Sequence, residues 1–357
     1  MKKIILVVLL VAILSFSVTA QRKTVNLPDL PGYITLKCDF HMHTVFSDGN
    51  VWPTVRVGEA YRDGLDVIAI TDHIEYSPHK NFIPVDHNAA WKIAESTAKE
   101  YNIILVHGAE ITRDMPPGHF NALFIEDASL LDVDSVWDAF TAAIKQKAFI
   151  HWNHPGWKSQ EPDGIPKLYE IHHRLIKNGW LHGIEFFNDS EYYPLVLTFC
   201  KKYNLAVIAN SDNHGVISEE YKSSEGYSNR PMTLVFAKER TNDALKEAMF
   251  AGRTIAYFKD MLAGKEEYAK PFFYQCISVG KKFYESEKNI YFEITNKSDI
   301  PFYLINGAPG TPSSITLPAN SSVRVSLSKK VTFPLVYDVR NILTGENEVL
   351  KVEIKFN

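Results

Sequence analysis

The sequence predicts an α/β protein, a barrel of strands and covering helices followed by a small antiparallel β-sandwich. From about Tyr33 to Phe258, short apolar runs alternate with amphipathic stretches, which is typical of strands that are each followed by a helix. Several of these runs are apolar throughout, so the strands are expected to be buried on both faces, as in a barrel. After Lys259 the helical pattern gives way to alternating segments.

The barrel elements can be placed along the chain from these patterns. The expected strands are Tyr33–His41, Val67–Asp72, Ile103–Glu110, Phe120–Ile125, Ala148–His151, Gly183–Phe187, Ala206–Asp212, Met232–Phe236 and Thr254–Phe258. The expected helices are Thr54–Arg62, Asn88–Glu100, Ser135–Gln146, Lys167–Lys177, Tyr193–Tyr203 and Asn242–Phe250. Thr54 and Thr241 suit helix N-caps, and Gly64 suits a helix end. The regular alternation over short connections predicts a parallel sheet.

The residue pattern of the last part of the chain differs from that of the barrel segment. From Pro271 to Asn357 few stretches look helical, and the pattern alternates at Asn289–Ile294, Ser322–Leu327 and Val349–Phe356. Turn-forming residues separate these segments, as in antiparallel sheets. We therefore expect a barrel domain over residues 21–265 and a β-sandwich domain over residues 271–357.

Residues 1–20 resemble a cleaved secretory signal peptide rather than part of the fold. Lys2 and Lys3 precede the apolar run Ile4 to Leu14, and Val18-Thr19-Ala20 offers a small-residue cleavage site. The apolar run is short for a bilayer span, and no later segment is long enough for one. The protein is therefore expected to be exported, to the periplasm or outside the cell, with no membrane span after cleavage.

Composition excludes some classes of function. The chain carries 38 Lys and Arg against 42 Asp and Glu without a basic run, so a nucleic acid polymer is not an expected partner. Three widely spaced cysteines, Cys38, Cys200 and Cys276, lie in apolar surroundings and are expected to be buried thiols. None has the spacing of a thiolate zinc site.

Histidines and carboxylates gather where the expected strands end. All 13 histidines lie between His41 and His214, and on a strand residues two apart, such as His41 and His43, face the same side. A single histidine at a strand end is more often a hydrogen-bonded polar residue than a ligand. Its recurrence at five or six strand ends predicts a multinuclear metal site, because strand ends of a barrel converge on one mouth. Imidazoles and carboxylates suit zinc, manganese or iron.

The same residues carry a family resemblance, which spans about Leu36 to Val216. The segment Asp39-Phe40-His41-Met42-His43-Thr44, with Ser47-Asp48-Gly49, resembles the first motif of the PHP (polymerase and histidinol phosphatase) superfamily. Thr71-Asp72-His73, His154-Pro155-Gly156 and Ser211-Asp212-Asn213-His214 are similar to its second, third and fourth motifs, and Gly108-Ala109-Glu110-Ile111 to the segment of its bridging glutamate. The resemblance implies a distorted (β/α)₇ barrel with two or three divalent metal ions at its mouth.

The resemblance also implies which residues hold each metal ion. One ion is assigned to His41, His43, Glu110 and Asp212, with the glutamate bridging. A second is assigned to His73, His214 and Asp48, where some family members have a histidine instead of the aspartate. A third is assigned to Glu110, His154 and His119. Asp72 and Glu185 are expected to orient ligand imidazoles.

Candidate catalytic residues other than metal ligands are less defined by the sequence. Arg113 could bind a phosphate with two hydrogen bonds, Lys158 could bind one as a point charge, and Arg230 is a third possibility. Each of these cations could equally be a solvated surface residue. His151 or Asp72 is the candidate general acid, although a buried, hydrogen-bonded His151 is the simpler interpretation.

These observations predict a metal-dependent phosphoesterase that uses a metal-activated hydroxide on a small phosphate-ester substrate. Phosphodiesters are preferred over phosphomonoesters such as sugar or nucleotide phosphates. Two alternatives stay open: an amide or lactone hydrolase like the amidohydrolases, and a non-catalytic, metal-dependent binding module. The sequence does not identify protein partners of the β-sandwich.

Overall fold

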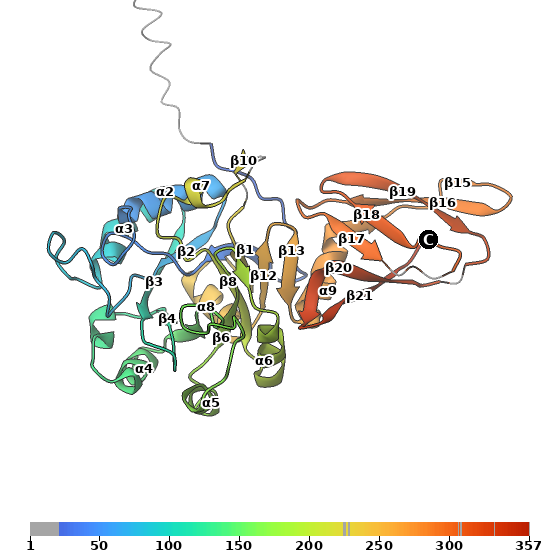
Figure 1. Cartoon of the computed structure of the whole chain (residues 1–357). Helices are drawn as coiled ribbons and strands as arrows, with labels where there is room; N and C mark the ends of the chain where they lie inside the picture. The colour runs from blue at the N-terminus through green and yellow to red at the C-terminus, as the bar shows by residue number, and fades with distance from the viewer. Residues whose placement is uncertain are drawn as a thin grey trace, which may run out of the picture.

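The computed structural model describes residues 21–223, 226–227, 229–305, 307, 309–331 and 333–356. The predicted signal peptide, residues 1–20, lies outside the described residues. A barrel with its helices forms one lobe and the β-sandwich the other, with α9 and β13 between them (Figure 1). Within the described chain no helix is both long enough and apolar enough to cross a membrane.

The barrel sheet is mixed, whereas the sequence predicted a parallel one. Its strands are β1 (Ile34–Asp39), β2 (Val67–Ile70), β3 (Ile104–Ile111), β4 (Phe120–Leu123), β5 (Phe149–Trp152), β6 (Gly183–Asn188), β8 (Ala206–Asn210), β11 (Met232–Ala237) and β12 (Thr254–Phe258). The runs β1-β2-β3 and β5-β6-β8 are parallel. β4 is antiparallel to β3 and β5, and β11 is antiparallel to β1 and β12. An apolar run does not encode strand direction, so the sequence pattern left these reversals open.

Threonine hydroxyls link β8 to its neighbours where the barrel closes. The Thr233 hydroxyl on β11 accepts from the Ala209 amide and donates to the Ala209 carbonyl, both at 2.9 Å. The Thr254 hydroxyl on β12 accepts from the Val207 amide at 3.1 Å. Since buried backbone groups need partners, these side chains replace the ordinary strand-to-strand bonds and distort the barrel at this seam.

The predicted helices form close to their expected positions. They are α2 (Pro53–Asp63), α3 (Ala89–Glu100), α4 (Val136–Lys145), α5 (Glu170–Lys177), α6 (Leu195–Tyr203) and α8 (Asn242–Phe250). Thr241 caps α8, since its hydroxyl accepts from the Ala244 amide at 3.2 Å. The prediction of Thr54 as an N-cap was wrong, because α2 begins at Pro53, a residue that favours the first helical position. Gly64 ends α2 with a φ of 80°.

Short elements fill the barrel loops. They are η1 (Ala128–Leu131), β7 (Glu191–Tyr192), α7 (Ile217–Glu220), β9 (Lys222–Ser223) and β10 (Gly226–Tyr227). β7 pairs with the end of β6 as a tight hairpin.

The C-terminal lobe is the predicted antiparallel β-sandwich. One sheet contains β14 (Ile277–Val279), β15 (Tyr284–Glu285), β16 (Asn289–Asn296) and β19 (Ser321–Ser328). The other contains β17 (Phe302–Ile305), β18 (Ser314–Leu317), β20 (Leu335–Gly345) and β21 (Glu348–Ile354). Alternate residues along these strands are buried, which is the pattern expected of a sheet with one face in a core.

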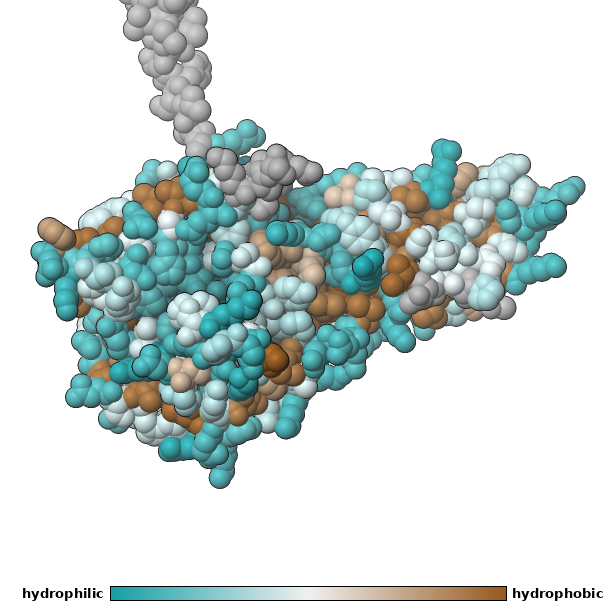
Figure 2. Space-filling model, in the orientation of Figure 1, coloured by the Kyte–Doolittle hydropathy of each residue, from teal (hydrophilic) through white to brown (hydrophobic). Residues whose placement is uncertain are grey.

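The two lobes share a sheet and a hydrophobic core. β13 (Met261–Gly264) pairs with β12 in the barrel and with β20 in the sandwich, and α9 (Glu266–Cys276) packs at the junction. Buried Phe272 and Phe302 belong to one cluster that continues from the barrel into the sandwich. On the face in Figure 2, hydrophobic residues gather where the lobes join, whereas hydrophilic residues cover much of the barrel. The three cysteines are buried and unpaired, as predicted.

Candidate metal centre

The loops after β1, β2 and β8 bring distant histidines together by backbone pairing that continues beyond the strands. The His43 amide donates to the Asn213 carbonyl at 3.0 Å, and the Asp212 amide donates to the His41 carbonyl at 2.8 Å. In the same way, His73 forms a parallel bridge with Glu110 on β3. The motif segments therefore lie side by side because the strands that precede them are neighbours.

All nine predicted metal ligands meet at this mouth of the barrel. They fall into four sets whose ligand atoms lie within 4.8 Å of one another: His43, Asp48, His73 and His214; His41, His43 and Asp212; His41, Glu110 and His154; and His73, Glu110 and His119. Because the sets share members, they form one continuous cluster.

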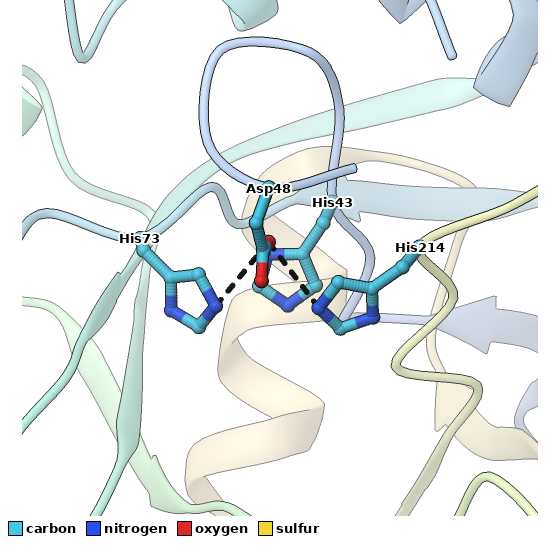
Figure 3. Close-up of side chains that lie close together, drawn as sticks. All are labelled: His43, Asp48, His73 and His214. Carbon is cyan, nitrogen blue, oxygen red and sulfur yellow. Dashed lines mark ion pairs between the residues drawn. The ribbon is translucent and has the colours of Figure 1, made fainter. Parts of the chain in front are cut away.

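Asp48 faces three imidazoles of the first set (Figure 3). Its Oδ1 lies 3.4 Å from His73 Nε2, 3.3 Å from His214 Nε2 and 3.8 Å from His43 Nδ1. The turn behind Asp48 requires glycine, since a Cβ on Gly49 would lie 2.6 Å from the His43 carbonyl carbon. The loop thus folds back tightly and presents the carboxylate to the rings.

Glu110 occupies the position of a bridging ligand. It is fully buried; its Oε1 lies 3.1 Å from His119 Nδ1 and 3.7 Å from His154 Nε2. Its Oε2 lies 2.7 Å from His73 Nδ1 and 3.5 Å from His43 Nε2. The two carboxylate oxygens therefore face different imidazole groups, an arrangement that can hold two cations.

Asp212 and His154 reach the cluster from strained backbone. The φ of Asp212 is 51° and that of His154 is 27°, in the left-handed region that non-glycine residues seldom occupy. Asp212 Oδ1 lies 3.0 Å from His43 Nε2 and 3.1 Å from His41 Nε2. Such strain persists where surrounding structure enforces it, and it is frequent at functional sites.

The donor set fits divalent cations. His41 Nε2 and Glu110 Oε2 are buried without a correctly oriented hydrogen-bond partner, although buried polar atoms nearly always have one. Both atoms point into the cluster, where a cation would satisfy them. Nitrogen and oxygen ligands without a thiolate suit zinc, manganese or iron.

The electrostatics of the cluster lead to the same conclusion. Burial would raise the pKa of the Glu110 carboxyl, but the surrounding histidines, His73 first, hold it well below its usual value. Burial opposes protonation of His73, yet Glu110 and Asp48 raise its pKa to about 10. Burial and the neighbouring His73 lower the pKa of His43 to about 3. Ionised carboxylates here need positive charge beside them, and bound metal ions would replace the protons in that role.

Glu185 lies where a residue that orients His41 is expected. It is fully buried, and its Oε1 lies 2.9 Å from His41 Nδ1, which directs His41 Nε2 toward the cluster. Its Oε2 accepts from the His154 amide at 2.7 Å and from Asn188 Nδ2 at 2.8 Å. One carboxylate thus positions ligands from two different loops.

Asp72 does not orient an imidazole directly, in contrast to the prediction. Its carboxylate accepts from the Thr44 amide at 2.7 Å, from the Thr44 hydroxyl at 2.6 Å and from the Ser47 hydroxyl at 2.6 Å. Those bonds fix the loop that carries Asp48. Asp72 therefore acts on the cluster through the backbone of that loop, and it does not line the cavity as a general acid would.

The other candidate catalytic residues also lie away from the cavity. His151 is fully buried, with Nε2 3.7 Å from Glu185 Oε1. Arg113 pairs with Glu75 at 2.8 Å and donates to the Val133 carbonyl, and Lys158 is exposed to solvent. None of these three is among the cavity-lining residues that the structure describes.

Arg230 has a structural role in the barrel. Its guanidinium is buried and pairs with Asp39 at 3.1 Å and with Asp63 at 2.9 Å. The sequence could not reveal this, since both carboxylates are distant in the chain.

Sequence reasoning missed Arg56 on α2. It is fully buried and donates from Nε to the His43 carbonyl at 2.9 Å and from a terminal nitrogen to the Asn213 carbonyl at 2.8 Å. Arg56 thereby joins the two loops that carry ligands. Its position in a helix gave no signal for this role.

Six of the thirteen residues that line the cavity were not among the predicted ligands. The cavity has a volume of about 530 Å³, and seven of the predicted ligands lie along it. The rest of its wall consists of Trp157, Asn188, Asp189, Ser190, Glu191 and Glu220. The run Asn188-Asp189-Ser190 directly after a strand was an available turn signal.

Comparison with a solved structure covers almost the whole chain. A two-domain Bacteroides vulgatus protein that contains a predicted PHP-like metal-dependent phosphoesterase is 41% identical, with a TM-score of 0.90. The match covers 94% of this chain and 99% of that one. Residues 277–355 match a family model described as an Ig-like domain.

Two curated proteins match shorter parts. An uncharacterized protein of Methanocaldococcus jannaschii is 39% identical over 84 residues, and a 5'-3' exoribonuclease of Haemophilus influenzae is 38% identical over 79 residues. These matches cover 23% and 22% of this chain, and 36% and 24% of the two relatives. The chain thus spans about a third of the length of the Methanocaldococcus jannaschii protein and about a quarter of the length of the exoribonuclease.

Proposed function

Since the chain belongs to the PHP-like metal-dependent phosphoesterases, we propose that it hydrolyses small phosphate esters and prefers phosphodiesters to phosphomonoesters. The observation that carries the proposal is the cluster of nine imidazole and carboxylate ligands at a cavity of about 530 Å³. A cavity of this size accommodates a small ester. We further propose that zinc, manganese or iron fills the cluster.

The metal ligands and the residues that hold them in place have different roles in the reaction. Cations held there would supply positive charge for a phosphoryl oxygen and would acidify a water molecule. Glu185 fixes the ring of His41, and Asn188 Nδ2 donates to Asp212 Oδ2 at 3.2 Å. Asp72 fixes the loop of Asp48. These contacts hold the ligands in place before substrate arrives, which lowers the cost of reorganisation during the reaction.

The charge of the cavity wall supports the preference for diesters. Among its described residues there is no lysine or arginine, whereas Asp189, Glu191 and Glu220 contribute carboxylates. A phosphomonoester carries up to two negative charges near neutral pH and a phosphodiester only one. The diester therefore meets less repulsion from the wall.

We also propose that the protein acts after export, on the basis of the residue pattern of positions 1–20. A phosphoesterase outside the cytoplasm would act on esters from the surroundings of the cell.

Three chromogenic substrates test the proposal. The purified protein is stripped of metal, reloaded with zinc, manganese or iron, and assayed on bis-p-nitrophenyl phosphate, p-nitrophenyl phosphate and an acyl anilide. We expect metal-dependent hydrolysis that is fastest on the diester. Hydrolysis of the anilide alone would show an amide hydrolase, and no turnover with any metal would leave a binding module.

A further inference from the structure

One wall of the cavity is the tight turn between β6 and β7. Asn188 pairs with Glu191, so Asp189 and Ser190 form a two-residue turn. The φ of Asp189 is 49°, a left-handed conformation that aspartate and asparagine adopt more readily than most residues. Asp189, Ser190 and Glu191 all line the cavity that contains the metal ligands.

The carboxylates of this turn have no cationic partner in the part of the chain that the structure describes. Asp189 Oδ2 accepts from the Ser190 hydroxyl at 3.2 Å, and Glu191 Oε2 accepts from the Tyr193 hydroxyl at 2.7 Å. The third wall acid, Glu220, differs, because its two oxygens accept from the Gly215 amide and from Asn213 Nδ2. Asp189 and Glu191 therefore keep negative charge available to a bound molecule.

An aromatic face lies in the same cavity. Trp157 is 40% exposed, and its ring lies 5.3 Å from that of His154 and 5.9 Å from that of His119, both candidate metal ligands. An exposed indole attracts organic cations through its ring face, and most strongly those that carry a spread positive charge. Carboxylates and an indole around one space form the chemistry that recognises an ammonium group.

The floor of the cavity would hold the other end of a substrate through the metal-ligand cluster. Glu110 lines the cavity, is fully buried and leaves Oε2 without a correctly oriented hydrogen-bond partner, which marks the place where the cluster would hold cations. With a phosphate group held there, as the proposed function requires, an ester arm would extend toward the wall. A second anionic group on that arm would meet Asp189 and Glu191.

We infer that Asp189, Glu191 and Trp157 bind an ammonium group on one ester arm, so that the preferred substrates are phosphodiesters of amino alcohols. The inference rests on the proposed function, because the cluster must hold the phosphate. It also disfavours polyanions such as oligonucleotides, which would place further phosphates against the two carboxylates.

Two probes of nearly identical shape isolate the charge. In p-nitrophenyl phosphorylcholine the arm ends in a quaternary nitrogen, and in p-nitrophenyl 3,3-dimethylbutyl phosphate a carbon replaces that nitrogen. We expect kcat/KM of the metal-loaded protein to be about ten-fold higher for the choline ester, in line with the attraction of a desolvated cation to carboxylates and an indole. Equal values for the two probes would overturn the inference.

Variants that remove the charge of Asp189 and Glu191 test whether these two residues cause the preference for the choline ester. Asp189→Asn keeps a residue that tolerates the left-handed turn, and Glu191→Gln keeps an acceptor for Tyr193. The double variant is expected to lose most of the preference for the choline ester, so that its kcat/KM values on the two probes become nearly equal. Glu126→Gln, an exposed acid that does not line the cavity, is the matched control. A preference that survives in the double variant contradicts the assignment.

A binding measurement separates this inference from the proposed function. Calorimetric titration of the metal-loaded protein with phosphocholine and with 3,3-dimethylbutyl phosphate requires no turnover. Tighter binding of phosphocholine without hydrolysis of any ester would refute the phosphoesterase proposal and retain the ammonium site. Hydrolysis of both diesters together with equal binding of phosphocholine and 3,3-dimethylbutyl phosphate would refute only the ammonium site. Faster hydrolysis of a diester with a glycerol arm than of the choline ester would also refute it.

Discussion

Replacing Glu185 with glutamine tests whether a buried carboxylate outside the ligand set controls metal affinity. Glu185 Oε1 lies 2.9 Å from His41 Nδ1 and accepts from Asn210 Nδ2 at 2.8 Å, and Oε2 accepts from the His154 amide and Asn188 Nδ2. Glutamine has the same shape but replaces one oxygen with an NH₂ group. That NH₂ group must then face donors that previously had an acceptor.

The size of the effect follows from those bonds. Losing one or two hydrogen bonds to a buried charged group costs about 3 kcal/mol of unfolding free energy. Removing the partner that orients a ligand histidine lowers metal affinity by about 10–100-fold. We therefore expect Glu185→Gln to bind metal about 10–100-fold more weakly than wild type and to regain much of its activity at high metal concentration.

The assay is a competition titration of metal against a chromogenic chelator, with thermal unfolding of each variant measured in parallel. Glu161→Gln is the matched control, since Glu161 is also a buried acid but pairs with Lys167 and Tyr169 away from the cluster. It should lower stability and leave metal affinity unchanged. If Glu185→Gln bound metal like wild type, Glu185 would not position His41.

Three further changes test separate parts of the structure. Asp48→Asn should remove about one metal ion per chain by elemental analysis, because its carboxylate faces three imidazoles; full metal content would contradict the assignment of Asp48. Thr233→Val should lower the unfolding free energy by about 1–3 kcal/mol in urea denaturation while the fold is kept, since it leaves the Ala209 amide and carbonyl without partners. An unchanged unfolding free energy would show that the Thr233 hydroxyl does not stabilise the contact between β8 and β11. His172 donates to the Pro117 carbonyl and accepts from the Tyr169 amide, and burial lowers its pKa to about 4, with His173 and Glu161 as its charged neighbours. Because the unfolded pKa is near 6.5, stability should be full above about pH 6.5 and fall by up to ~3 kcal/mol as the pH drops to about 4. His172→Gln should flatten that fall, and an equally steep fall in the variant would assign it to other groups.

The clustering of the nine candidate ligands was predictable because they belong to short motifs at strand ends. His41, Glu110 and Asp212 follow or end apolar runs, and strands of one barrel bring such ends together whatever their separation in sequence. The positions of strands and helices were predictable for the same reason, since apolar periodicity records burial.

Other features depend on partners that the sequence does not pair. Arg113 and Arg230 resemble phosphate-binding residues in sequence, but Glu75 and Asp39 already neutralise them in the fold. α9 was not predicted because Pro271 lies inside it, and a proline in that position normally argues against a helix.

Metal content and phosphodiester hydrolysis measured on the same samples show whether metal ions bound at the cluster carry the activity. Metal-free protein is titrated with zinc, manganese or iron, and at each step bound metal and the rate on bis-p-nitrophenyl phosphate are recorded for wild type and His41→Ala. We expect the wild-type rate to rise with bound metal up to two or three ions per chain, whereas His41→Ala binds less metal and stays inactive. Equal hydrolysis by metal-free protein, or an unchanged metal content and rate in His41→Ala, would contradict this expectation.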